Sequence, residues 1–184
     1  MASHGDREIS SATAANLSFK HAEYEALRQE ILTRNEFRQR TVELTLLSSG
    51  AILAAGLKIE DLGPLLLLYP VAVFFLAASW AHNGVGVLLA GSHIREQFEG
   101  PSDDNGWEST WRSHPLARPF SILAVLSSSG VFLTVQLLTW GLGLTQFQHR
   151  TGDWVLAAAG GAAIVATFVL MRYYARLQQS PGRM

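Results

Sequence analysis

The side chains that could do chemistry in this sequence lie at the ends of long apolar stretches. Five of them are expected at a similar depth: Glu43, His82, Asn83, Ser121 and Arg172. A carboxylate and an imidazole held together there could carry protons or bind a cation, because ionisable groups in apolar surroundings are costly and usually functional. The same five could instead form a structural layer in which helices satisfy one another's polar groups, and we favour this interpretation.

Stronger catalytic patterns do not occur in the sequence. It has no phosphate-binding glycine loop, paired-carboxylate motif or Ser/His/Asp arrangement. His82 and His93, with Glu96 one turn further on, resemble a metal pair only loosely. The chain has no cysteine for thiol chemistry, and its net charge of −1 provides no basic field for nucleic acid. We therefore expect no cofactor, metal or nucleic-acid partner, and we favour a non-enzymatic protein while leaving an enzyme open as an alternative.

Gln136 and two tryptophans each have two interpretations. Gln136 is the one strongly polar residue deep in its apolar segment, where an amide usually joins helices but could line a pore in an oligomer. Trp107 and Trp111 are four residues apart and would share a helical face. We favour an anchor at the membrane interface for this pair. A binding site for a partner or ligand is the alternative.

These residues belong to a chain with the composition of a membrane protein. Hydrophobic residues make up 48% and charged residues 16%, against roughly 25% charged in soluble domains. Because about 20 apolar residues cross roughly 30 Å of hydrocarbon, four segments qualify as membrane spans: residues 41–57, 64–81, 120–144 and 154–171. Apolar residues continue from the second segment to residue 90.

The predicted fold is therefore an all-α integral membrane protein with four transmembrane helices and cytoplasmic helical extensions. We divide the chain into a disordered tail (1–16), a cytoplasmic amphipathic helix (17–40), a first transmembrane hairpin (41–90), a cytoplasmic helix and loop (91–119), a second transmembrane hairpin (120–171) and a cytoplasmic tail (172–184).

Lysine and arginine near the span ends predict the orientation. One side of the membrane has only Lys58 and Arg150. The other side has ten such residues: Arg28, Arg34, Arg38, Arg40, Arg95, Arg112, Arg118, Arg172, Arg176 and Arg183. Positive charge stays in the cytoplasm. We therefore expect a multi-pass protein of the inner (plasma) membrane with both termini in the cytoplasm.

The cytoplasmic segments carry two apolar stripes. One consists of Tyr24, Leu27 and Ile31, and the other of Val87, Gly91, Ile94 and Phe98. We expect the two stripes to pack together as a cytoplasmic helical pair, with a membrane-surface helix as the alternative. The second helix would either continue unbroken or bend at residues 83–86, and the Glu30–Arg34 spacing predicts an ion pair within the first helix.

The general layout looks like that of the small pore-forming effectors of bacterial defence systems, a resemblance of architecture alone. Small four-helix multidrug transporters also place a glutamate in their first span, but Glu43 is shallower and the cytoplasmic segments are longer. We expect a non-enzymatic protein that self-associates as a pore, effector or scaffold, with the bilayer, a second copy and a cytoplasmic protein as partners. The alternatives are a proton- or cation-coupled transporter using Glu43 and, third, a membrane enzyme acting on lipid.

Overall fold

The computed structural model of the chain describes residues 4–99, 114, 117–148 and 150–179. All secondary-structure elements in the described residues are helices, and none is a strand, which confirms the all-α prediction. Four long helices make up the molecule: α1 (His4–Gly56), α2 (Gly63–Ile94), α4 (Ala117–Thr145) and α5 (Thr151–Gln179). A short helical turn, η1 (Glu60–Leu62), precedes α2, and a π-helical turn, η2 (Arg95–Glu99), follows it.

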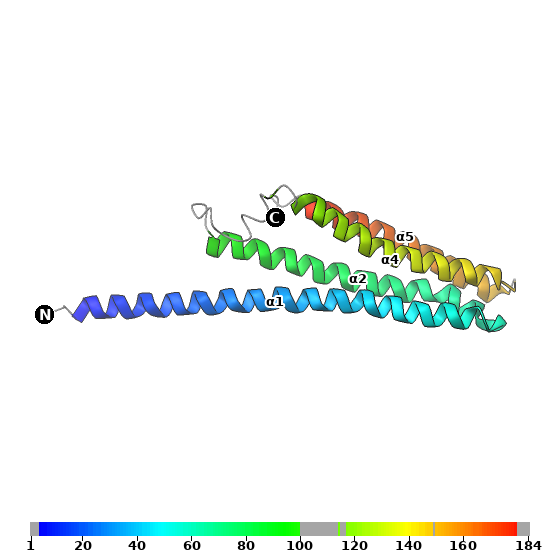
Figure 1. The fold of residues 1–184 in the computed structure, drawn as a ribbon, viewed down its shortest axis with the longest axis horizontal. Coiled ribbons are helices and arrows are strands. Elements are labelled where there is room, and N and C mark those ends of the chain that lie inside the picture. Colours follow the sequence, from blue (N-terminus) through cyan, green and yellow to red (C-terminus); the bar gives the residue numbers. More distant parts are fainter. Residues whose placement is uncertain (1–3, 100–113, 115–116, 149, 180–184) are drawn as a thin grey trace.

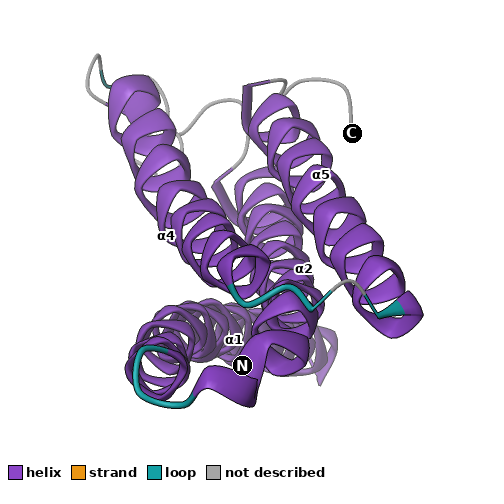
Figure 2. Cartoon of the chain, turned by 90° about the vertical axis from the view of Figure 1, so that its right-hand side faces the viewer, coloured by secondary structure: helices purple, strands orange, loops and turns teal. Residues whose placement is uncertain are grey.

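Helix α2 is the central helix of the bundle. It packs against α1, α4 and α5, and α4 also contacts both of the other helices. Figure 2 shows this arrangement end-on, with α2 between α1, α4 and α5. The α1–α2 and α4–α5 connections lie at one end of the bundle, and α1 begins and α5 ends toward the other (Figure 1). The N-terminal part of α1 extends beyond the end of α2.

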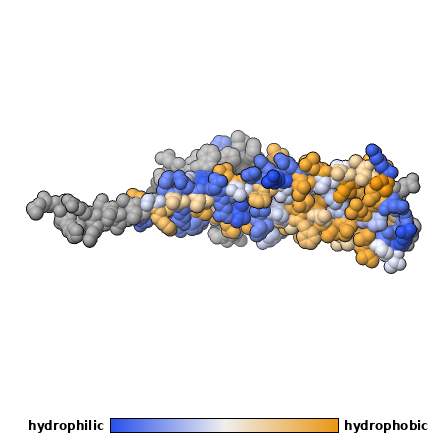
Figure 3. Space-filling model, turned by 90° about the horizontal axis from the view of Figure 1, so that it is seen from below, coloured by the Kyte–Doolittle hydropathy of each residue, from blue (hydrophilic) through white to orange (hydrophobic). Residues whose placement is uncertain are grey.

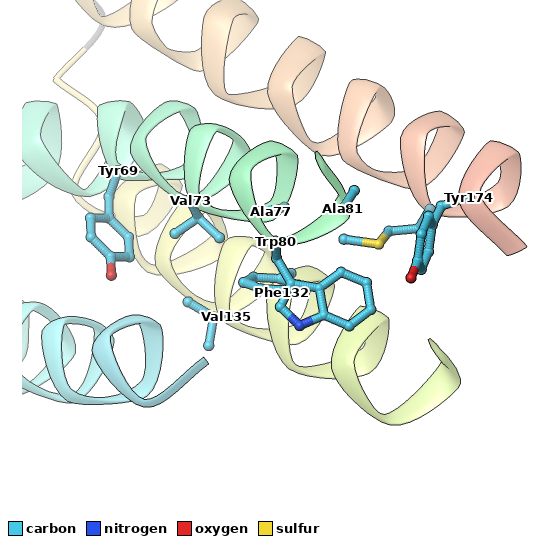
Figure 4. Close-up of a cluster of buried hydrophobic side chains, with 9 residues drawn as sticks. Tyr69, Val73, Ala77, Trp80, Ala81, Phe132, Val135 and Tyr174 are labelled. Atoms are coloured by element: carbon cyan, nitrogen blue, oxygen red, sulfur yellow. The ribbon is translucent and has the colours of Figure 1, made fainter. Parts of the chain in front are cut away.

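The core of the bundle is a cluster of aromatic and small apolar side chains. Trp80 of α2 meets Phe132 of α4 and Tyr174 of α5 edge to face, with ring centroids 6.1 Å and 5.3 Å apart. This geometry is the preferred one for aromatic pairs and holds three helices at one level. Figure 4 shows most of the cluster, whose buried members are Tyr69, Val73, Ala77, Trp80, Ala81, Phe132, Val135, Met171 and Tyr174.

Glycines in α2 and α5 let the helices approach closely. A side chain at Gly84 would collide with the Tyr174 hydroxyl, and one at Gly86 would collide with the Arg34 guanidinium. A side chain at Gly160 would strike the Leu67 carbonyl. The predicted alternative of a bend at residues 83–86 is wrong, because α2 runs unbroken through them. The glycines there serve close packing instead.

The two apolar stripes pack together as a helical pair, as predicted. The Tyr24 ring of α1 meets the Phe98 ring of η2 at 5.7 Å, and Ile94 is fully buried. His93 Nε2 lies 3.5 Å from a Glu23 carboxylate oxygen on α1. We call this pair, residues 17–40 with 84–99, the stalk.

Two of the four predicted spans are long and apolar enough in the described residues to cross a membrane. They are Gly63–Phe98 and Thr151–Gln178. The first predicted span falls short because α1 ends at Gly56, so its last 18 residues include Gln39 and Arg40. Most side chains in the first turns of α4 lie outside the described residues.

The described surface has an apolar belt at the end of the bundle that holds the hairpin turns. Figure 3 shows apolar side chains gathered there, with polar side chains at the tip and over the opposite half. Exposed large apolar residues from all four helices form this belt: Leu44, Leu46, Leu47, Leu65, Leu68, Phe75, Leu137, Leu138, Leu144, Val155, Val165, Phe168 and Val169. We use the term apolar belt for these residues.

Candidate functional site: a partly buried arginine beside the aromatic core

The five polar residues expected at one depth do not form a bonded cluster. The side chains of Glu43, His82 and Arg172 are exposed. Asn83 donates its Nδ2 to the Ser79 carbonyl of its own helix at 3.0 Å. Among the described residues, no hydrogen bond or ion pair joins any of these four to another. The Ser121 side chain lies outside the described residues, as do Trp107 and Trp111.

Gln136 lies in the interior of the bundle, fully buried between three helices. Its Nε2 donates to the Pro70 carbonyl of α2 and to the Thr167 hydroxyl of α5, both at 2.9 Å. Its Oε1 is buried without a hydrogen-bond partner. In one copy of the chain, the Gln136 amide therefore joins helices and does not reach the surface.

A group of hydroxyl side chains joins α1 to α2. The Tyr69 hydroxyl lies 2.6 Å from Ser48 Oγ and 3.0 Å from Ser49 Oγ. Thr45 is fully buried beside them and donates to the Thr41 carbonyl at 2.8 Å. Small hydroxyl side chains that bond across helices are typical of helix contacts in lipid, where hydrocarbon offers them no partner.

The most unusual group in the bundle is Arg38. Its guanidinium carbon lies 4.1 Å from the centroid of the Trp80 ring and 5.9 Å from that of Tyr174. A cation over an aromatic face is attracted by the ring quadrupole, by about 2 kcal/mol when the pair is desolvated. Arg38 of α1 thus meets α2 and α5 at a single point.

The helix pattern turns Arg38 inward. It lies seven residues after Ile31 and seven before Thr45, so the three share the face of α1 that packs on α2. On the other side, Gly84 lets the Tyr174 ring come close to α2. The spacing of residues on α1 and the glycine on α2 therefore place the guanidinium between the helices.

The surroundings of Arg38 disfavour its charge. Burial lowers the pKa of the Arg38 guanidinium, and the nearby Tyr174 acts in the opposite direction. Its Nε is buried and has no hydrogen-bond partner. No described carboxylate forms an ion pair with it. Since a guanidinium stays protonated in proteins, the site holds a positive charge that lies over two aromatic rings and has no described carboxylate paired with it.

The other described arginines of this region contrast with Arg38. Arg34 donates Nε and Nη2 to Glu30 Oε1 at 2.8 Å and 2.6 Å, which confirms the predicted pair. Arg172 is exposed, with its guanidinium 5.8 Å from the Phe168 ring. Arg40 is exposed on α1 only two residues beyond Arg38. Sequence reasoning used Arg38 only as one of ten positive charges, although its heptad relation to Ile31 marks it as inward-facing.

The opposite end of the bundle is held by amide and carboxylate caps. Gln146 Nε2 donates to the Gly56 carbonyl at 2.6 Å, which ties the two hairpin turns together. Asp153 is buried and accepts the backbone N–H groups of Gln148 and Arg150 at 3.1 Å and 3.2 Å. This end is a closed polar cap.

The described residues contain no group of three His, Cys, Asp or Glu side chains that could hold a metal ion. His93 of the loosely predicted pair contacts Glu23, and His82 is exposed. Comparisons with protein-family models, with curated proteins and with solved structures find no match for this chain.

Proposed function

We propose that the chain is a multi-pass membrane protein whose apolar belt lies in the bilayer and whose stalk receives a cytoplasmic protein partner. In this proposal it is a non-enzymatic, self-associating pore, effector or scaffold. One observation carries this proposal. In one half of the bundle, apolar side chains cover the outside and polar side chains are buried between the helices.

The belt would be unfavourable in water. Leu47, Phe75 and Val155 are more than 60% exposed, and they come from three different helices. Soluble monomers rarely expose contiguous apolar patches larger than a few hundred Å². At the same time Gln136 and Thr167 are fully buried between helices. Hydrocarbon would surround the exposed apolar side chains favourably. It offers no hydrogen-bond partner to Gln136 and Thr167, which therefore bond to each other.

In this proposal all four long helices cross the membrane, not only the two that qualify by length and apolar composition. Helices α1 and α4 contribute residues to the belt at the level where α2 and α5 do, and they pack directly on α2. Residues 120–145 of α4 contain no Lys, Arg, Asp or Glu. A bundle that inserted only α2 and α5 would leave the belt residues of α1 and α4 in water.

The stalk then lies on the side that is rich in arginine, which supports a cytoplasmic location for both termini in the inner membrane. Protease protection in sealed vesicles tests the topology. We expect tags at both termini to be cleaved only when the protease is on the cytoplasmic side, and the protein to resist alkaline extraction. Cleavage of the two tags from opposite sides, or release by alkali, would overturn the proposal.

Self-association is supported by a small-residue face that the bundle leaves open. Gly50, Ala51 and Ala54 are exposed on α1, and a side chain at Gly50 would meet no atom within 4 Å. Faces of this kind allow close contact between helices in lipid. By contrast, Ala159 and Ala163 of α5, which are also four residues apart, are at least partly buried inside the bundle.

The oligomeric state of the full chain in native-lipid nanodiscs tests this part. We expect an oligomer that Gly50→Leu weakens, while Ala158→Leu, at an exposed alanine on α5, leaves it unchanged. Reconstituted bilayers then separate a pore, which conducts, from a silent scaffold. A monomer in lipid would overturn self-association. The Glu43 transporter draws no support from the contacts of that exposed side chain.

A further inference from the structure

We propose that Arg38 and Tyr174 form a binding site for a phosphate group, between α1, α2 and α5 at the inner end of the apolar belt. The assignment of its source, the headgroup of an inner-leaflet phospholipid, rests on the membrane insertion proposed above. The recognition of phosphate does not.

Arg38 offers hydrogen-bond donors that have no acceptor among the described residues. The Trp80 face covers one side of the guanidinium at 4.1 Å, which leaves the N–H edge to other groups. The Arg38 side chain makes no hydrogen bond within the described residues, and its Nε is buried. A buried donor without a partner costs about 1–3 kcal/mol, and more when it is charged. An anion at the guanidinium edge would offset the charge that burial disfavours.

Tyr174 supplies another donor near the guanidinium. Its ring is 2% exposed, and its hydroxyl oxygen accepts a hydrogen bond from Gln178 Nε2 at 2.9 Å. The hydroxyl proton has no acceptor among the described residues. Since the guanidinium carbon is 5.9 Å from the Tyr174 ring, one tetrahedral anion could accept from both side chains.

The depth of Arg38 along the bundle also fits a phospholipid headgroup. Arg38 lies about 27 Å along α1 from Gly56, at 1.5 Å per residue. Gly56 is at the polar cap, where Gln146 binds its carbonyl. Hydrocarbon is about 30 Å thick, so a bundle with its cap at the outer face brings Arg38 close to the phosphates of the inner leaflet. A planar guanidinium matches the paired oxygens of a phosphate better than an ammonium does.

The test uses the full chain purified in mild detergent and titrated with phosphatidylglycerol, with bound lipids counted by native mass spectrometry. We expect Arg38→Gln to weaken the tightest lipid site about tenfold or more, the loss typical of a charge-assisted hydrogen bond. Arg40→Gln removes the same charge at an exposed position two residues away. It should change the affinity less than twofold, as expected for an unpaired surface charge.

Two further variants keep the test decisive if Arg38→Gln loses helicity. Tyr174→Phe removes only the hydroxyl and should weaken the same site about threefold. Arg38→Lys keeps the charge without the planar fork and should bind between wild type and Arg38→Gln. The proposal is wrong if the Arg38 and Arg40 variants retain lipid equally and Tyr174→Phe binds like wild type.

Inorganic phosphate distinguishes the two sources. If millimolar phosphate displaces the Arg38-dependent lipid, the site takes a phosphate group that is reached from water. If the lipid persists, the phosphodiester is held in the bilayer plane. A chain that alkali releases from membranes, yet binds phosphate through Arg38, would overturn the membrane function and leave this site standing.

Discussion

Replacing Gly160 with alanine should destabilise the bundle, whereas the same change at the next residue should not. A Cβ at Gly160 would lie 2.5 Å from the Leu67 carbonyl oxygen and 2.8 Å from Trp140 Cδ1. Non-bonded heavy atoms attract best at about 3.5 Å, so α5 would have to retreat from α2 by roughly 1 Å. At Gly161 the new Cβ would meet only Trp140 Cζ2, at 3.6 Å, which is ordinary contact.

The magnitude follows from three contributions. Overpacking a close helix contact costs about 1–3 kcal/mol. A retreat of α5 also strains the hydrogen bond from Trp140 Nε1 to the Ala157 carbonyl, which is 3.0 Å long and worth about 0.5–1.5 kcal/mol. Alanine gains roughly 0.5–1 kcal/mol over glycine in a helix. We therefore expect Gly160→Ala to lose about 1–3 kcal/mol and Gly161→Ala to gain up to about 1 kcal/mol.

The assay is reversible unfolding of the full chain in mild-detergent micelles by added dodecyl sulfate, followed by helicity and tryptophan fluorescence. Both variants have the same composition and the same propensity gain, so their difference isolates the approach of α5 to the Leu67 carbonyl. If Gly160→Ala unfolds at the same dodecyl sulfate fraction as Gly161→Ala or later, the packing described for α2 and α5 is incorrect.

Four smaller changes test other contacts. Gln136→Leu should change the unfolding free energy in the same assay by less than about 1 kcal/mol. The variant loses two hydrogen bonds of about 0.6 kcal/mol each. It also no longer buries the unpartnered Oε1, which offsets that loss. Tyr69→Phe should cost about 1 kcal/mol through its bonds to α1, and an unchanged midpoint would contradict those bonds. Phe98→Ala should raise amide hydrogen exchange in the stalk around Tyr24 and leave the belt helices protected; equal exchange in both would mean that the stalk and bundle unfold as one unit. Asp153→Ala should raise exchange in the α4–α5 turn, since two backbone donors lose their acceptor, and unchanged exchange there would count against this cap.

Much of the fold was predictable because it depends on periodicity. Apolar length and spacing predicted the long helices and their antiparallel hairpins. The stripe that contains Tyr24 and the stripe that ends at Phe98 predicted the stalk contact, since an apolar face in a polar helix needs a partner. The sequence left the course of α2 undecided between an unbroken helix and a bend, because Gly84 and Gly86 can mark either a bend or a close contact. The role of these glycines depends on Tyr174 and Arg34, which belong to other helices.

The candidate site was predicted less well, because the depth of a residue along a helix does not tell which way its side chain faces. Counting residues from a span end gives a level in the membrane but not the face of the helix. Glu43 is five residues after Arg38, about 140° around α1, and its side chain is exposed. His82 is two residues after Trp80 and is also exposed. The polar residues that share a level therefore do not share a face, whereas Arg38 does face its neighbours.

The length of α1 has a mechanical consequence. It is one helix of 53 residues, about 80 Å at 1.5 Å per residue, and the same rod contributes to both the stalk and the belt. Arg38 is the point along the rod where it touches α2 and α5 together, which makes this contact a fulcrum. A tilt of about 5° around it would carry the start of α1 through roughly 4 Å. Force applied to the N-terminal arm of α1 would then reach Gly50 and the open face around it as a smaller movement in the opposite direction.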